Sequence, residues 1–364
     1  MLTIAQLLRF MASQKASDLH LSAGEQPIVR VHGDLQRIDV PALTPDETHR
    51  LIFDIMNDGQ RRAYQEKLEL DFAFALDDEL RFRVNVFVQN RGEGAVFRSI
   101  PTKIPSFTDL NLPPVLRHMA EQDKGLFLVT GPTGSGKSTT LAAMIDHINE
   151  TTAGHILTLE DPIEFVHKSK RCLVNQREIG LQSHSFNNAL KSALREDPDV
   201  ILVGELRDLE TVSLALTAAE TGHLVFGTVH TSSAPKTVDR LIDVFPTAQQ
   251  AQIRTMLSES LLGVATQALL PKIGGGRAAA IEILVATPAV RNLIREGKTF
   301  QIPSAMQVGG RIGMVTMEAA LAELVAKGVV SPDEVRSRLP EVADRPGTDA
   351  TAAARPRVAQ GGAR

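Results

Sequence analysis

The sequence contains no tryptophan, one tyrosine and one cysteine among its 364 residues. The single cysteine, Cys172, excludes a disulfide framework and a four-cysteine zinc site, and it fits a reduced, cytoplasmic setting. The net charge of −4 and the scarcity of aromatic side chains give no support for a nucleic-acid motor, which would need a basic face or stacking platforms. We therefore expect a protein that does not act on nucleic acid.

Long apolar runs are missing as well. No run of roughly 18 consecutive apolar residues occurs, so we expect no membrane-spanning helix. The opening segment, MLTIAQLLRFMASQK, lacks a basic region and a small-residue cleavage site, which argues against a secretion signal. Any association with a membrane is therefore expected to go through partners.

The most informative segment is GLFLVTGPTGSGKSTT, an apolar run followed by a glycine-rich turn and the start of a helix. It contains the phosphate-binding P-loop pattern G-x-x-x-x-G-K-S, in which backbone N–H groups and a helix dipole converge on an anion. Lys137 is expected to reach the β- and γ-phosphates, and Ser138 to place its hydroxyl on Mg²⁺. The predicted ligand is ATP with Mg²⁺, bound by Gly131, Pro132, Thr133, Gly134, Ser135, Gly136, Lys137, Ser138 and Thr139.

Residues 1–100 are predicted to form a small α+β domain. Apolar spacing in 2–12 indicates an opening helix, and a start signal at Thr44 begins a second helical pattern that runs over 45–69. Alternating runs typical of strands occur at 18–22, 27–33, 35–39, 71–76, 81–90 and 94–100. Residues 101–116 hold four prolines and no periodicity, which is typical of a linker.

Residues 117–343 are predicted to form an α/β domain. Short apolar runs alternate with helical segments, which favours a largely parallel sheet covered by helices. These runs occupy 125–130, 155–160, 172–176, 200–205 and 223–230. Residues 247–263 and 284–340 are expected to be mainly helical, and the tail, 344–364, to be disordered.

Acidic residues follow two of these strands. HILTLEDPIEF supplies Glu160, Asp161 and Glu164, and VILVGE supplies Glu205. ATP hydrolysis needs one carboxylate to hold hydrated Mg²⁺ and one to orient and deprotonate water. Because Gly204 stands where an aspartate is common, Glu205 is expected to bind Mg²⁺ through water. Glu164 would then be the general base, although the reverse assignment of the two glutamates fits as well. Asp161, which precedes a proline, is as well explained by capping a turn as by a catalytic role.

A histidine marks a further strand end. HLVFGTVHTSS places Thr228, His230 and Thr231 there, beside three strand ends that already carry candidate site residues. His230 is therefore expected to sense the γ-phosphate or to link neighbouring parts of the site. His223, at the other end of this segment, is expected to cap the preceding helix.

Arginines are candidates to stabilise charge on the transferred phosphate, and an adjacent subunit can supply them. Arg81, Arg83 and Arg98 lie on the last strands of the first domain, and their odd spacing puts Arg81 and Arg83 on one strand face. A solvated polar face is the alternative interpretation. Arg195 is a further candidate within the core domain.

Five segments together resemble the secretion-ATPase superfamily and, within it, the type IV pilus retraction ATPases, over about residues 3–335. The segments are ASDLHLSAG, GPTGSGKSTTLAAMIDHIN, ILTLEDPIEFVH, ALREDPDVILVGELRD and TAAETGHLVFGTVHTSSA. The resemblance implies a RecA-like P-loop ATPase core with a smaller PAS-like α+β N-terminal domain. It also implies an Asp box, an atypical Walker B motif and a His box, whose residues are Glu160, Asp161, Glu164, Glu205, His223 and His230.

Two features favour the retraction ATPases over other members of this superfamily. Extension and type II secretion ATPases usually carry a four-cysteine motif, which one cysteine cannot form. The segment AVRNLIRE at 289–296 is similar to the AIRNLIRE segment of retraction ATPases, where it is tied to retraction rather than to hydrolysis. Taken alone, it is an amphipathic packing helix with Val290, Leu293 and Ile294 on one side and Arg291 and Arg295 on the other.

The resemblance predicts a homohexameric ATPase that couples hydrolysis to pilin disassembly at an inner-membrane platform protein, and so powers twitching motility. Each site would lie between the two domains of one subunit, completed by a neighbour's arginines, and the linker would act as a hinge. An accessory retraction paralogue or a secretion ATPase would share every catalytic residue. A nucleic-acid motor and a non-hydrolysing nucleotide switch are more distant alternatives.

Overall fold

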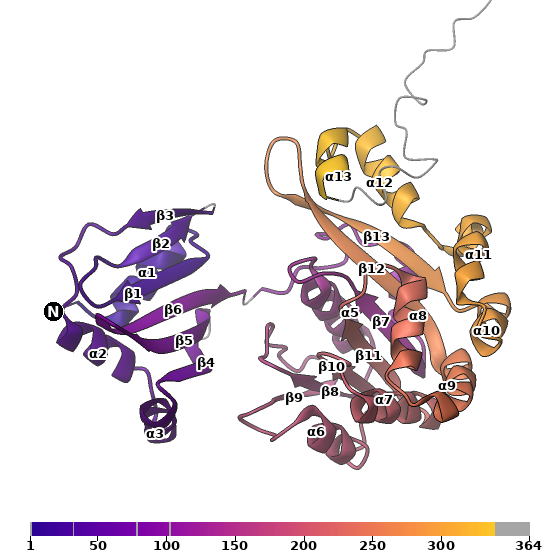
Figure 1. Cartoon of the computed structure of the whole chain (residues 1–364), viewed down its shortest axis with the longest axis horizontal. Coiled ribbons are helices and arrows are strands. Elements are labelled where there is room, and N and C mark those ends of the chain that lie inside the picture. The colour runs from indigo at the N-terminus through magenta and orange to yellow at the C-terminus, as the bar shows by residue number, and fades with distance from the viewer. Residues whose placement is uncertain (1, 32, 78, 102, 339–364) are drawn as a thin grey trace, which may run out of the picture. The chain divides into compact units, whose positions relative to one another are not determined.

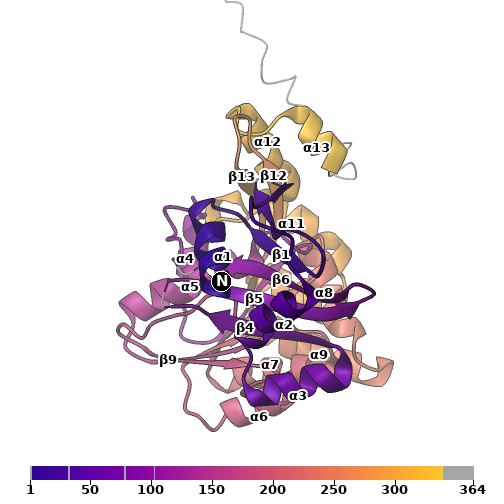
Figure 2. The same ribbon diagram turned by 90° about the vertical axis from the view of Figure 1, so that its left-hand side faces the viewer.

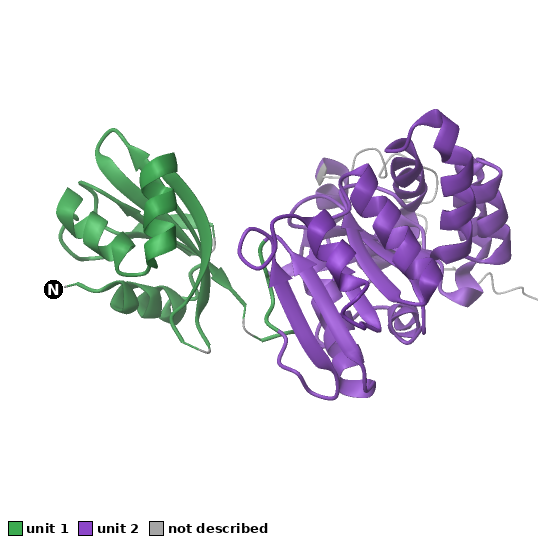
Figure 3. Ribbon diagram, turned by 90° about the horizontal axis from the view of Figure 1, so that it is seen from below, with its two compact units in different colours: residues 1–104, 162–166 green, residues 105–161, 167–364 purple. Residues whose placement is uncertain are grey.

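The computed structural model describes residues 2–31, 33–77, 79–101 and 103–338. Contacts divide the chain into unit 1, residues 1–104 and 162–166, and unit 2, residues 105–161 and 167–364 (Figure 3). Unit 2 therefore begins inside the segment expected to be a linker. Phe107 and Leu116 are buried in the core of unit 2, and helix α4 starts at Pro114. The predicted tail lies outside the described residues.

Unit 1 is built around an antiparallel sheet of six strands with the order β3-β2-β1-β6-β5-β4 (Figure 1). Its elements are α1 (Ile4–Ser13), β1 (Asp18–Ser22), β2 (Ile28–Val31), β3 (Asp34–Arg37), α2 (Pro45–Phe53), α3 (Asp58–Lys67), β4 (Glu69–Ala75), β5 (Arg81–Gln89) and β6 (Gly92–Ile100). Alternate residues of the central strands point into the core, where Phe82, Val84 and Phe97 are fully buried.

The single helix predicted over 45–69 is wrong, because the structure has two helices there. Thr44 and Glu47 form a capping box at the start of α2, and Asn57 and Gln60 form another at the start of α3. Each cap satisfies backbone N–H groups that a helix start leaves without partners. The second cap begins a new helix where the apolar spacing alone suggested continuation.

Unit 2 is built around a sheet of seven strands with the order β13-β12-β7-β11-β10-β8-β9, parallel except for β13 (Figures 1 and 2). Its elements are α4 (Pro114–Ala120), β7 (Gly125–Thr130), α5 (Lys137–Thr151), β8 (His155–Glu160), β9 (Leu173–Glu178), α6 (Phe186–Ala193), β10 (Val200–Val203), α7 (Leu209–Thr221), β11 (Leu224–Val229), α8 (Ala234–Asp243), α9 (Thr247–Ser260), β12 (Leu261–Pro271), β13 (Arg277–Val285), α10 (Pro288–Arg295), η1 (Thr299–Gln301), α11 (Ile302–Val308), η2 (Gly310–Ile312), α12 (Met317–Ala326) and α13 (Pro332–Arg338).

The mainly helical character expected at 247–263 and 284–340 is confirmed within the described residues, and the strands β12 and β13 correct only the bounds of these segments. Helix α9 ends at Ser260, β12 starts at Leu261, and residues 284 and 285 still belong to β13. Neither LLGVATQALLP nor RAAAIEILV shows the regular alternation of apolar and polar residues that predicts a strand. Pairing of β12 with β7 decides their conformation, because tertiary context overrides weak propensity.

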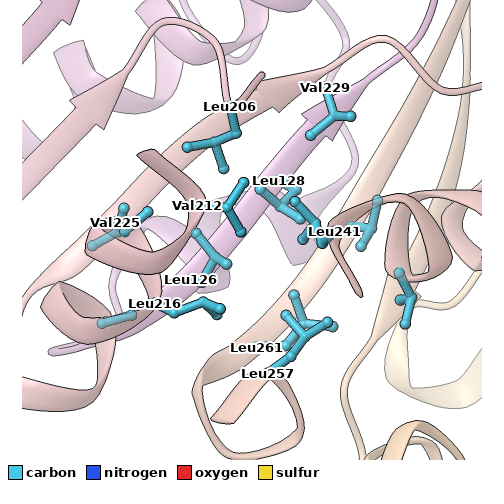
Figure 4. Close-up of a cluster of buried hydrophobic side chains, with 14 of the residues drawn as sticks. Leu126, Leu128, Leu206, Val212, Leu216, Val225, Val229, Leu241, Leu257 and Leu261 are labelled. Carbon is cyan, nitrogen blue, oxygen red and sulfur yellow. The ribbon is translucent and has the colours of Figure 1, made fainter. Parts of the chain in front are cut away.

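The core of unit 2 lies between the sheet and its helices. Every residue of β7 and β11 is buried, as expected for central parallel strands covered on both faces. Figure 4 shows Leu126 and Leu128 of β7 among side chains from α7, α8 and α9. This packing holds the strands rigid, so their carboxyl ends form a firm edge. Within the described ranges, no helix combines the length and apolar character that crossing a membrane requires.

Replacing Phe97 by alanine should lower the free energy of unfolding of unit 1 by about 3–5 kcal/mol, because the ring is fully buried and leaves a cavity. Urea unfolding followed by tyrosine fluorescence measures this, since Tyr64 is the only tyrosine and lies in unit 1. Leu35→Ala, at a residue that is 55% exposed, should change the value by less than about 0.5 kcal/mol. Equal midpoints for both variants would contradict the assignment of Phe97 to the core.

Candidate functional site

The P-loop connects β7 to α5 and depends on glycine at specific positions. Gly131, Gly134 and Gly136 all have positive φ, at 135°, 78° and 92°, a region that other residues rarely occupy. A Cβ on Gly131 would also lie 2.3 Å from the carbonyl oxygen of Gln267 on β12. The loop is therefore pressed against a neighbouring strand, and it leads directly into the N-terminus of α5.

Lys137 is the first residue of α5 and its side chain turns back over the loop. Its Nζ donates to the carbonyl oxygens of Gly131 at 2.9 Å and Pro132 at 3.1 Å, and it lies 3.5 Å from Nδ1 of His230. The residue is only 8% exposed. Within the loop, the buried Ser135 Oγ has no hydrogen-bond partner among the described residues. The loop thus holds an ammonium group and a buried hydroxyl at a helix N-terminus, which suits a phosphate.

Strand β12 supports the P-loop from the side through two hydrogen bonds. Thr130, the residue before the loop, donates from Oγ1 to Thr266 Oγ1 at 2.9 Å. Gln267 donates from Nε2 to Oγ1 of Thr140 on α5 at 2.7 Å, and the residue is 1% exposed. Sequence reasoning missed Gln267 and Thr266, because their strand was not recognised.

Glu205 follows β10 and lies between two cationic or potentially cationic groups. Its Oε2 is 2.6 Å from an Arg207 guanidinium nitrogen and 3.5 Å from Nε2 of His230. Burial raises the pKa of Glu205, but the hydrogen bond and charge of Arg207, with His230, outweigh burial and lower it. Glu205 is therefore a carboxylate at neutral pH. His230 joins the two parts of the site, with Nδ1 toward Lys137 and Nε2 toward Glu205.

Arg207 is a site residue that sequence reasoning did not single out. Its hydrogen bond to Glu205 and the charge of that carboxylate raise the pKa of the guanidinium. The residue stands two positions after Glu205 in GELRD, which is the signal that could have found it. It fixes the orientation of the carboxylate.

Gly204 explains why Glu205 follows no aspartate. A Cβ on Gly204 would lie 3.1 Å from the carbonyl oxygen of Leu159 and 3.3 Å from Cα of Glu160 on the neighbouring strand β8. The Gly204 N–H donates to Leu159 O at 2.7 Å, and the Thr228 hydroxyl donates to Gly204 O. The strand end is therefore too tightly paired to accept an aspartate without displacement.

The first acidic cluster is divided between the two units. Glu160 ends β8 in unit 2, where its Oε1 accepts hydrogen bonds from Thr158 at 2.6 Å and Gln176 at 3.2 Å. Asp161 is exposed in unit 2. Glu164 is exposed and lies in residues 162–166, which group with unit 1. The fold therefore brings Glu160 to the strand-end edge with Glu205.

Two candidate residues lie away from this edge. Arg195 follows α6 and precedes β10, so it lies at the opposite end of that strand from Glu205. His223 precedes β11, where its Nδ1 is 3.0 Å from the carbonyl oxygen of Ala218 at the end of α7. This contact matches the helix-capping role expected for His223.

The three candidate arginines of unit 1 share one face of its sheet. Arg83 faces Arg98 directly across β5 and β6. Arg98 Nε is 2.9 Å from Oδ1 of the buried Asp18, and Arg83 Nε is 3.9 Å from Oδ1 of Asp71. Like charges placed opposite each other destabilise a sheet, and these carboxylates offset that repulsion.

The AVRNLIRE segment begins one residue into α10. Val290 and Ile294 are fully buried, and Arg295 is exposed. Arg291 packs inward instead of toward solvent, and its guanidinium donates to the carbonyl oxygens of Ala286 at 2.8 Å and Ser258 at 2.7 Å. Burial lowers the pKa of Arg291. The two arginines of this segment therefore have different environments.

Comparison with known proteins gives consistent results. The model of the type II/IV secretion system protein family matches residues 2–276. The chain is 59% identical over 340 residues to the type IV pilus retractation ATPase PilT of Pseudomonas aeruginosa, covering 93% of this chain and 99% of that protein. It is 55% identical over 337 residues to a twitching motility protein of Neisseria gonorrhoeae, covering 92% and 90%.

A solved structure of the pilus retraction motor PilT with bound ADP aligns with a TM-score of 0.89 at 48% identity, covering 95% of this chain and 98% of that one. The matched region includes both units and the P-loop. The chain therefore belongs to the type II/IV secretion system ATPase family and, within it, to the type IV pilus retraction ATPases.

Proposed function

We propose that this chain hydrolyses ATP with Mg²⁺ as a homohexameric ring and uses the energy to disassemble pilin at an inner-membrane platform protein, which retracts the type IV pilus. The observation that carries the proposal is the convergence of Lys137, His230 and Glu205 at one edge of the sheet. The relatives named for pilus retraction and twitching motility support the choice of cargo.

The residues present fit a magnesium nucleotide. Ser138 lies one residue after Lys137 in the first turn of α5, and hydroxyl and carboxylate oxygens suit Mg²⁺. Both contacts of Glu205 use Oε2, so its Oε1 is the oxygen proposed to hold a water of hydrated Mg²⁺. Bound Mg²⁺ would neutralise charge on the β- and γ-phosphates.

The reaction requires a water oxygen to attack the γ-phosphorus while the bond to the β–γ bridging oxygen breaks. A carboxylate takes the proton of that water, and ADP and inorganic phosphate leave. Lys137 holds the β- and γ-phosphates, and His230 senses the γ-phosphate from its position between Lys137 and Glu205. Glu164 is proposed as the general base, with Glu160 held in position by Thr158 and Gln176.

The arginine face of unit 1 is proposed to complete a neighbouring subunit's site. Arg81, Arg83 and Arg98 concentrate positive charge on one sheet face, which suits the charge of a transferred phosphate. Neighbouring subunits of the ring would then share their active sites, because each subunit contributes its P-loop to one site and its arginines to another.

Lys137→Ala should lower ATP hydrolysis by at least on the order of 100-fold, because the phosphates lose their main cation. Phosphate release measures this, with Lys191→Ala as the control at an exposed lysine on α6. In a strain that lacks the gene, Lys137→Ala should leave surface pili without twitching, and Lys191→Ala should restore twitching. Loss of surface pili would contradict retraction and indicate pilus extension.

Glu205→Gln should raise the Mg²⁺ concentration needed for half-maximal hydrolysis by about tenfold, because a neutral amide binds the hydrated cation poorly. Glu164→Gln should lower turnover on the order of 100-fold without changing that concentration. Magnesium titrations of phosphate release test both, with Glu66→Gln as an exposed control. The opposite pattern would exchange the two roles, and normal turnover in both variants would remove them from the mechanism.

Arg83→Ala and Glu205→Ala should each be inactive alone yet recover hydrolysis when mixed, because a mixed ring contains sites with both residues intact. Phosphate release as a function of mixing ratio measures the recovery. Lys137→Ala mixed with Glu205→Ala is the matched control and should stay inactive, since both residues belong to one unit. Absence of recovery in the first mixture would show that subunits do not share sites.

A further inference from the structure

Glu282 is a buried carboxylate that contacts two helix N-termini at once. It lies on β13 and is only 6% exposed. Its Oε1 accepts from the N–H of Ala234, the first residue of α8, at 2.7 Å, and its Oε2 accepts from the N–H of Met317, the first residue of α12, at 3.3 Å. The positive ends of two helix dipoles thus stabilise one charge.

The two contacts add to the helices' own caps. Ser233 and Thr316 accept from the N–H groups of Lys236 and Ala319, deeper in each first turn. Glu282 accepts a hydrogen bond from the first N–H of each helix, which those caps do not satisfy. A single side chain therefore fixes the position of one helix start relative to the other.

On one side, this carboxylate is connected to the proposed γ-phosphate sensor. Only residues 231–233 separate His230 from Ala234, and the hydroxyls of Thr231 and Thr237 lie 2.7 Å apart, tying this loop to the first turn of α8. The loop that carries His230 is therefore short and bonded to the start of α8.

On the other side, Glu282 is in register with the residue before the P-loop, and its strand contacts the C-terminal helix α12. Thr130, Thr266 and Glu282 are directly opposite one another on β7, β12 and β13. Val315, just before α12, exchanges two backbone hydrogen bonds with Ile283. Met317 and Leu321 of α12 also pack on the β12–β13 hairpin, and Figures 1 and 2 both show β13 beside α12.

We infer that Glu282 is a positioning residue that couples the nucleotide state at His230 to the placement of α12. The inference rests on the proposed role of His230 in sensing the γ-phosphate. When that loop moves with the γ-phosphate, α8 moves with it, and the shared carboxylate transfers the shift to α12. The same contact works in reverse, so a load on α12 changes the position of His230, because coupling between two sites is reciprocal.

Hydrogen exchange of the first-turn amides of α12 tests the coupling. In the wild-type protein, exchange should differ about fivefold or more between ADP and a non-hydrolysable ATP analogue. Glu282→Gln keeps one accepting oxygen but presents an amide N–H₂ to the other helix. The nucleotide-dependent difference should therefore shrink to less than about twofold.

Thr316→Ala is the matched control, because it weakens α12 through its own cap and leaves Glu282 in place. It should speed exchange with both nucleotides and keep the difference between them. Glu282→Gln should also lower kcat for ATP about tenfold with KM changed less than about twofold, since His230 is displaced while the P-loop is not. If Glu282→Gln does not fold, Glu282→Asp, which shortens the reach to both helices, replaces it with the same expectations.

Wild-type exchange that is identical with both nucleotides would overturn the inference, as would a difference that survives in the Glu282 variant. Both results leave ATP hydrolysis and its dependence on Lys137 intact. Failure of wild-type hydrolysis would instead overturn the proposed function. Loss of the difference in Thr316→Ala as well would reduce Glu282 to a structural role and overturn its part in the coupling.

Discussion

The parallel hydrogen-bond register of β7 with β11 and β12 is the constraint on which the site depends. It places the residue before the P-loop, Thr130, directly opposite Val229 and Thr266. Because β7 and β11 end together, His230 emerges beside Lys137. Strand β12 continues past Thr266 to Pro271 and supports the loop from its other side. The same long-range pairing buries every residue of β7 and β11, so the strands beneath this edge are shielded from water.

Much of this edge could be predicted from the sequence because its determinants are local. The P-loop is a backbone motif with its own glycine pattern, and the rule that ligands gather at the ends of parallel strands identified the places of Glu205 and His230. Gln267 and Glu282 could not be found this way. Gln267 donates to Thr140 on α5, and Glu282 accepts from the first N–H groups of α8 and α12. These partners are distant in sequence and the two strands were not predicted, so only the tertiary structure reveals the two residues.

The split of the acidic and basic residues between units follows from chain connectivity as much as from chemistry. Residues 162–166 leave β8 and group with unit 1, then the chain returns to unit 2. Glu160 and Glu164, four residues apart, therefore belong to different units. No periodicity in the sequence signals that excursion, because five residues are too few to carry a secondary-structure pattern. The arginine face, in contrast, follows directly from strand alternation.

Gly204 has a consequence for how the carboxylate of Glu205 is held. A side chain at position 204 would press on the backbone of Leu159, and the carboxylate stands one position later, on the segment that follows β10. There the sheet no longer dictates its rotamer, and Arg207 and His230 do so instead. The alignment of this acid thus depends on two neighbouring side chains, and a substitution of either one would change it without altering the sheet.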